Sequence, residues 1–184
     1  MPALNTTGRS EMASDILKTL SKEHDLVSDL FKELNETTER AAKGRPELLE
    51  KIKAALLPHA LWEEKVFYPE FKKRADRDGL VTHAEAVQEH RAIELRVLPD
   101  LETASPTSTE FAGRAKVMGE FVEHHAKEEE KTMFAMARKL FSAEERADLD
   151  AQYAQWKASP QVTEALAQAS EKAAAAARAN PPPA

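Results

Sequence analysis

Apolar residues recur at intervals of three and four along almost all of this 184-residue chain. That spacing places them on one face of an α-helix, and no stretch shows the strict alternation expected of a half-buried β-strand. Glycine occurs only 5 times, whereas the good helix formers Ala, Glu, Lys and Leu abound. The sequence therefore predicts an all-α fold.

The first two helices are expected to be joined by a short break rich in glycine and proline. The first is predicted over residues 14–40, and the second near Pro46, because proline suits the first helical turn. Pro58 lies inside the second helix, where it removes a backbone donor. We therefore expect a single helix that bends just before His59.

Capping signals predict where the next two helices begin. Thr82 with Glu85, and Thr107 with Glu110, have the spacing of a capping box, in which a hydroxyl and a carboxylate satisfy the free backbone N–H groups. Four helices with short connections pack as an antiparallel, up-down four-helix bundle. This bundle is the predicted architecture.

Two additional C-terminal helices are expected after the bundle. Ser142 with Glu145 predicts one start, and Ser159 before Pro160 predicts the other. The chain thus divides into a flexible N-terminus, the bundle, a helical extension and a flexible tail: residues 1–13, 14–141, 142–178 and 179–184.

Each predicted bundle helix carries one histidine in the middle of its apolar stripe: His24, His59, His90 and His125. Residues midway along neighbouring helices lie at the same level of a bundle, so these imidazoles should converge. A single inward histidine is usually a satisfied core residue. Four at one level are different, because each unpaired polar group would cost a few kcal/mol. The pattern indicates a binding site.

Two of these histidines are followed by a glutamate four residues later, as His59-x-x-x-Glu63 and His125-x-x-x-Glu129. Four residues rise by about 6 Å, roughly one turn, so each pair presents a nitrogen and a carboxylate on one face. Neutral imidazoles suit iron or zinc, and inward carboxylates can bridge two cations. Six such donors would leave coordination positions of two irons open for a small ligand.

Composition excludes several other classes of function. The chain has no cysteine, which excludes disulfides, thiolate metal sites and cysteine nucleophiles. Its 32 acidic and 26 basic residues argue against nucleic-acid binding. No run of about 18 apolar residues suggests membrane insertion, so a cytoplasmic location is expected. No Gly-rich nucleotide loop or Ser-His-Asp set points to organic substrates.

Four segments resemble the hemerythrin-like, HHE cation-binding family: SKEHDLVSDLF, HALWEEKVFYPEF, QEHRAIE and FVEHHAKEEEKTMF. The family pattern is one histidine on the first helix, HxxxE on the second, one histidine on the third and HxxxE on the fourth. The resemblance spans roughly residues 14–141. It implies that two non-haem iron ions, oxo- or hydroxo-bridged, are held by His24, His59, Glu63, His90, His125 and Glu129, with zinc as a possible substitute.

The resemblance specifies the site better than the activity. It implies a di-iron protein that binds or senses dioxygen or nitric oxide. The alternatives are a di-iron oxidoreductase that removes peroxide or nitric oxide, and a metal-storage or zinc-binding bundle. Whether the protein is an enzyme stays open, and so does the identity of any protein partner.

A second register exists on the fourth helix, formed by His124 with Glu128. The recurrence of Glu-Glu-Lys at residues 63–65 and 129–131 favours His125 with Glu129. His124 would then face water or hydrogen-bond to a ligand from outside.

The third helix holds two further candidate ligands. The oxygen carriers that this chain resembles have an extra histidine one turn from another on that helix, but Ala86 and Glu94 stand at those places here. Glu94 could supply an oxygen ligand, which puts simple oxygen transport in doubt. His83 precedes His90 by two turns, about 10.5 Å, which is too far to share its metal.

Overall fold

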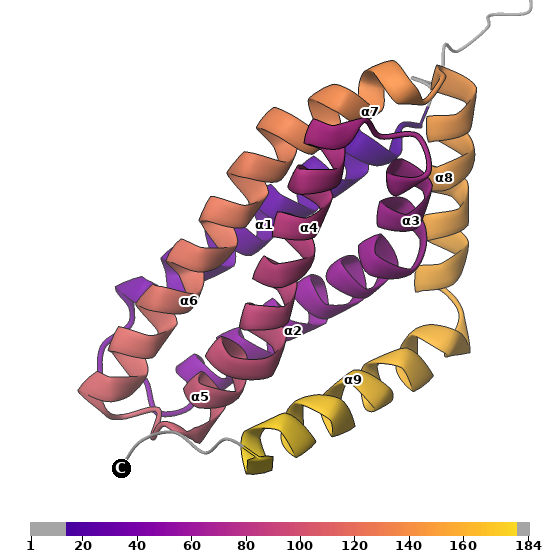
Figure 1. Cartoon of the computed structure of the whole chain (residues 1–184). Helices are drawn as coiled ribbons and strands as arrows, with labels where there is room; N and C mark the ends of the chain where they lie inside the picture. Colours follow the sequence, from indigo (N-terminus) through magenta and orange to yellow (C-terminus); the bar gives the residue numbers. More distant parts are fainter. Residues whose placement is uncertain (1–13, 180–184) are drawn as a thin grey trace, which may run out of the picture.

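The computed structural model describes residues 14–179 and is helical almost throughout. The four long helices are α1 (Ile16–Glu36), α2 (Gly44–Trp62), α4 (Arg77–Ala92) and α6 (Thr109–Glu128) (Figure 1). Three of them continue through one π-helical turn into a short helix. These turns and helices are η1 (Glu63–Phe67) and α3 (Tyr68–Lys72), η2 (Ile93–Val97) and α5 (Leu98–Thr103), and η3 (Glu129–Met133) and α7 (Phe134–Leu140).

Two more helices follow the bundle, α8 (Ala143–Lys157) and α9 (Pro160–Ala179). Helix α8 packs on α1, and α9 packs on α2 and η2 (Figure 1). The predicted all-α bundle with additional C-terminal helices is therefore confirmed. The predicted flexible ends fall on residues 1–13 and 180–184, outside the described residues, and Ala179 ends α9.

Several predicted helix boundaries were wrong. The first helix is shorter than residues 14–40, because the Asp15 side chain caps it by accepting from the Leu17 N–H and Thr37 already has an extended backbone. In contrast, the second helix continues through Pro58 to Trp62, so the predicted single helix is confirmed.

The third helix begins well before the predicted capping box at Thr82. Asp76 is its N-cap and accepts a hydrogen bond from the Gly79 N–H at 3.0 Å. Gly79 lies against the preceding segment so closely that a Cβ there would come within 2.8 Å of the Ala75 Cβ. The glycine is therefore needed for close packing and does not mark a loop.

The fourth helix begins one residue later than predicted, because Ser108 and not Thr107 caps it, accepting from the Phe111 N–H. In contrast, the capping box predicted for Ser142 and Glu145 is present. The helix predicted at Pro160 begins there.

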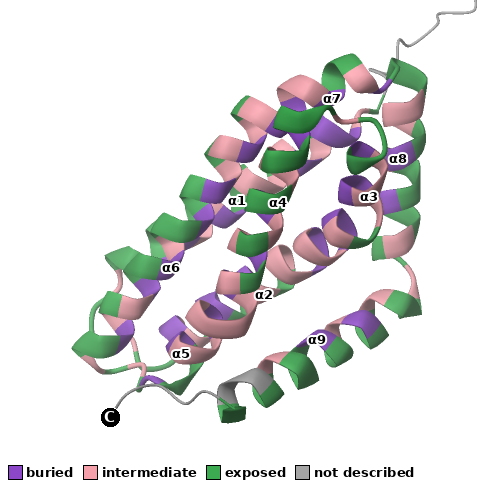
Figure 2. Cartoon of the chain, in the orientation of Figure 1, coloured by how far each residue is buried: buried purple, intermediate pink, exposed green. Residues whose placement is uncertain are grey.

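Two apolar clusters fill the bundle on either side of the histidine level. One includes Leu20, Trp62 and Phe134, and the other includes Val27 and Met118. His24 follows Leu20 by one turn and precedes Val27 by about one turn, so the polar layer lies between two water-excluding layers. Buried residues accordingly face the inside of the bundle (Figure 2). Within residues 14–179, no helix has both the length and the hydropathy to cross a membrane.

Candidate metal centre

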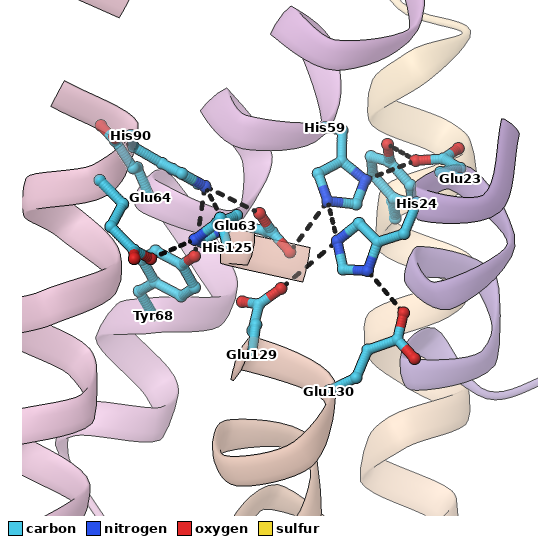
Figure 3. A network of polar contacts seen from close by, with 12 residues as sticks. Glu23, His24, His59, Glu63, Glu64, Tyr68, His90, His125, Glu129 and Glu130 are labelled. Atoms are coloured by element: carbon cyan, nitrogen blue, oxygen red, sulfur yellow. Dashed lines mark hydrogen bonds and ion pairs between the residues drawn. The ribbon is translucent and has the colours of Figure 1, made fainter. Parts of the chain in front are cut away.

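Six side chains meet in the middle of the bundle: His24, His59, Glu63, His90, His125 and Glu129 (Figure 3). They form two groups of possible metal ligands whose donor atoms lie within 4.8 Å of one another. The first group is His24, His59, Glu63 and Glu129, and the second is Glu63, His90 and His125. Every predicted principal ligand thus reaches one centre.

Glu63 stands between two pairs of imidazoles. The Nε2 atoms of His24 and His59 are 3.1 Å apart, and those of His90 and His125 are 2.9 Å apart. One carboxylate oxygen of Glu63 lies 3.2 Å from His59 Nε2, and the other lies 3.5 Å from His90 Nε2. Glu63 is therefore placed to bridge two cations.

The outer nitrogen of each imidazole faces a carboxylate from a neighbouring helix. Hydrogen bonds join His59 Nδ1 to Glu23 (2.9 Å), His24 Nδ1 to Glu130 (2.8 Å) and His125 Nδ1 to Glu89 (2.8 Å). A carboxylate only accepts, so each of these three rings donates a proton from Nδ1, and its Nε2 atom faces the centre.

The fourth ring is fixed less well. Glu64 lies 3.3 Å from His90 Nδ1, but without hydrogen-bond geometry, and that nitrogen has no hydrogen-bond partner among the described residues.

Sequence reasoning did not identify these four outer glutamates. Their only signal is position, because Glu23 and Glu89 directly precede a ligand histidine, and Glu64 and Glu130 directly follow a ligand glutamate.

The donor set fits metal cations. All four carboxylate oxygens of Glu63 and Glu129 are buried without a hydrogen-bond donor in the described part of the chain. A buried carboxylate without a donor is strongly unfavourable, as are two imidazole lone pairs about 3 Å apart, unless a positive charge lies between them. Metal ions would satisfy both groups.

Protons partly take this role when no metal is bound. Burial, together with the charge of Glu63, raises the pKa of Glu129 well above its usual range. Burial lowers the pKa of His24 to about 3. His59 is also buried, but the charges of Glu63 and Glu23 outweigh this and raise its pKa to about 10. At neutral pH His59 of the metal-free centre therefore carries a second proton, and the carboxyl of Glu129 takes up a proton at a higher pH than usual.

The π-helical turns place these carboxylates. Glu63 opens η1 and Glu129 opens η3. A π-helical turn holds an extra residue and re-aims the side chains around it, a feature frequent at functional sites. Here it allows Glu63 to enter the centre while Glu64, the next residue, reaches His90 from outside.

The structure places the secondary candidates outside the centre. His124 is 66% exposed and lies 3.5 Å from Glu89, and Glu128 pairs with Lys131. His83 lies beside the Tyr68 ring, away from the ligands. Glu94 belongs to neither group of donor atoms, but it lines the cavity beside the four histidines and forms an ion pair with Lys172 of α9 at 3.6 Å.

Tyr68 also lies beside the centre. It is buried, and its hydroxyl lies 3.4 Å from His90 Nε2. On the opposite side Phe134 stacks on the His24 ring, with the ring centres 5.9 Å apart. Tyr68 therefore lies beside His90 of the second group, and Phe134 beside His24 of the first.

A cavity of about 40 Å³ adjoins the four histidines. Its other walls are mainly apolar and include Val27, Leu57, Ile93, Val122 and Ala169 of α9. A space that holds one water needs about 10–15 Å³ on the same measure, so this cavity suits a molecule of two or three atoms. On the other side of His24 a wider, polar groove of about 580 Å³ runs between α1 and α6.

Comparisons with known proteins agree with this geometry. The family model described as "Hemerythrin HHE cation binding domain" matches residues 4–137. A protein named "DNA nickase" from Nostoc sp. (strain PCC 7120 / SAG 25.82 / UTEX 2576) is 27% identical over 143 residues, which cover 76% of this chain but 38% of that protein. No solved structure matches the chain significantly. With its buried His/Glu clusters, the chain belongs to the hemerythrin HHE cation-binding domain family.

Proposed function

We propose that this protein is a non-haem di-iron protein that binds or senses dioxygen or nitric oxide. The observation that carries the proposal is the pair of buried carboxylates without hydrogen-bond donors in the described structure, Glu63 between the two pairs of imidazoles and Glu129 beside His24. Mixed imidazole and carboxylate donors that leave positions open are typical of non-haem iron, whereas a structural zinc site is closed and tetrahedral. Two irons, when bound, supply reversible electron transfer to a small ligand.

The protein itself limits which ligands reach the centre. The 40 Å³ cavity has room for a diatomic molecule but not for an organic substrate. Its apolar walls also exclude most water, which strengthens electrostatic interactions inside. Tyr68 holds a proton at Oη beside His90 and can donate it to a small ligand in that half.

Metal analysis of three proteins tests the assignment. The wild type is expected to bind about two irons per chain. His125→Ala should lose most of this metal, whereas His124→Ala, which removes the exposed neighbouring imidazole, should keep it. Equal iron content in the three proteins would contradict the assignment of His125 as a ligand.

Mixing the diferrous protein with each small ligand separates the candidate activities. A persistent, reversible adduct with dioxygen or nitric oxide supports binding or sensing, and an absorption spectrum with and without azide would show an open coordination position. Rapid oxidation with turnover of peroxide or nitric oxide supports the oxidoreductase alternative. Preferential retention of zinc without redox change supports metal storage.

The nickase activity of the Nostoc relative is not proposed for this chain, which covers 38% of that protein. The formal net charge of −6 is unfavourable for binding a polyanion. We propose instead that nucleic acid is not its substrate and that it acts in the cytoplasm. Nicking of supercoiled DNA by the iron-loaded protein would refute the first of these statements.

A further inference from the structure

The centre is built from two similar halves. The chain separation from Glu23 to His59 is 36 residues, and the same separation joins Glu89 to His125. Likewise 35 residues separate His24 from His59 and His90 from His125. Glu23 and Glu89 thus play equivalent parts, each fixing the histidine of the following long helix, so a difference between them is a difference between the two halves.

The two equivalent glutamates have different surroundings. Besides His59, Glu23 accepts hydrogen bonds from the Tyr153 hydroxyl at 2.6 Å and from Lys157 Nζ at 2.6 Å, and both donors belong to α8. Besides His125, Glu89 meets only the exposed ring of His124 at 3.5 Å in the described structure. Glu23 is therefore fixed by three donors, and Glu89 by one.

Tyr153 is rigidly placed to perform this role. Its side chain is 1% exposed, and its ring packs against Trp62, the residue before Glu63, with the ring centres 4.8 Å apart. Lys157 lies over the same ring, at 5.2 Å from its centre. The aromatic ring fills the core while its hydroxyl holds a carboxylate, and a buried tyrosine hydroxyl generally needs such a partner.

We propose that helix α8 is part of the metal centre: Tyr153 and Lys157 position Glu23, and through it His59, so that the His24/His59 half holds its metal more tightly than the His90/His125 half. This inference rests on the proposed binding of two metals. Both rings of the first half have hydrogen-bonded Nδ1 atoms, whereas His90 of the second half has none. Outer hydrogen bonds of this kind fix the orientation of the imidazole, and their loss typically weakens metal binding 10- to 100-fold.

Release of ferrous iron to a coloured chelator, measured anaerobically, tests the proposal on the full chain. We expect two phases from the wild type, a fast one from the His90/His125 half and a slow one from the His24/His59 half. Tyr153→Phe removes only the hydroxyl and should accelerate the slow phase about 10-fold. The matched variant Glu89→Gln should accelerate the fast phase and leave the slow one unchanged.

A second measurement separates positioning from a general loss of structure. In the zinc-loaded protein, Tyr153→Phe should shift the NMR resonance of the His59 Nδ1 proton and leave that of His125 in place. Lys157→Met should accelerate the slow phase of iron release. Lys157→Arg keeps the positive charge and should release iron nearly as slowly as the wild type. Thermal unfolding of each metal-free variant shows whether the bundle is intact.

Three results would overturn the inference: a single release phase in the wild type, equal acceleration of both phases by Tyr153→Phe, or no effect of that variant. Failure of the proposed function itself looks different, because the wild type would then bind no iron. Two bound irons that are released identically would refute the asymmetry alone.

Discussion

The properties of single residues at this centre are set by pairing each ligand histidine with a carboxylate outside it. The convergence of the six candidate ligands could be predicted because His-x-x-x-Glu spacing and apolar stripes are local features of the sequence. Glu23 could not be predicted, because a glutamate on a helix is usually solvated and its partner Tyr153 lies 130 residues further along the chain. The outer carboxylates could thus not be predicted because their partners lie far away in the sequence.

Metal binding should depend on pH because the metal-free centre holds protons. Burial raises the pKa of Glu129, and the carboxylates around the buried His59 raise its pKa to about 10. A cation that binds His59 Nε2 must displace the second proton of that ring, and the raised pKa of Glu129 adds to this competition, so zinc binding should release protons and its apparent affinity should increase as the pH is raised from 6 to 8. Titration calorimetry in two buffers of different ionisation enthalpy measures this release.

The free energy of unfolding of the metal-free protein should decrease as the pH is raised, whereas the affinity for zinc should increase. The pKa of His59 is higher in the folded state than its ordinary value of 6.5. The contribution of protonated His59 to the free energy of unfolding is therefore complete below pH 6.5 and is lost as the pH rises through about 10. The His59→Gln variant, compared over the same pH range, should show less of this loss. Binding of zinc that does not vary with pH would contradict the assignment of these protons.

At the level of the helices, the periodicity of apolar residues predicted which helices exist and in what order, but it predicted their first and last residues less well. The Ser142 capping box was correct, whereas the one at Thr82 was wrong because Asp76 offers an earlier cap. The π-helical turns were not predicted at all. No local propensity of the sequence marks them, although two of the three begin at Glu63 and Glu129, whose side chains meet at the centre.

The true start of α4 can be tested by removing each candidate cap. Asp76→Ala takes away the acceptor for the Gly79 N–H and should lower the free energy of unfolding by about 1 kcal/mol. Thr82→Ala, inside the helix, is the matched control and should have a smaller effect. Urea unfolding of the metal-loaded protein measures both. A larger loss for Thr82→Ala would favour the predicted boundary over the observed one.

For the whole molecule, the bundle and its two extra helices contribute to different parts of the centre. Helix α8 contacts it through Glu23, whereas α9 covers the cavity with Ala169 and forms the ion pair between Lys172 and Glu94. The sequence predicted both helices but not their roles, because neither contains a histidine and their contacts depend on how they pack against the bundle. The family resemblance could not supply these roles either, since its match ends at residue 137.

The position of α9 predicts that a larger side chain at residue 169 will obstruct the small ligand without disturbing the metals. Ala169 is 9% exposed and lines the 40 Å³ cavity, so the added atoms of Ala169→Leu would occupy much of that space. The rate of nitric oxide binding to the diferrous protein, measured by stopped flow, should fall several-fold while the iron content stays at the wild-type level. Gln168→Leu places the same side chain on the neighbouring exposed position and should leave the rate unchanged. If both variants bind nitric oxide as fast as the wild type, the ligand enters elsewhere, and the polar groove that ends at His24 between α1 and α6 becomes the route to block.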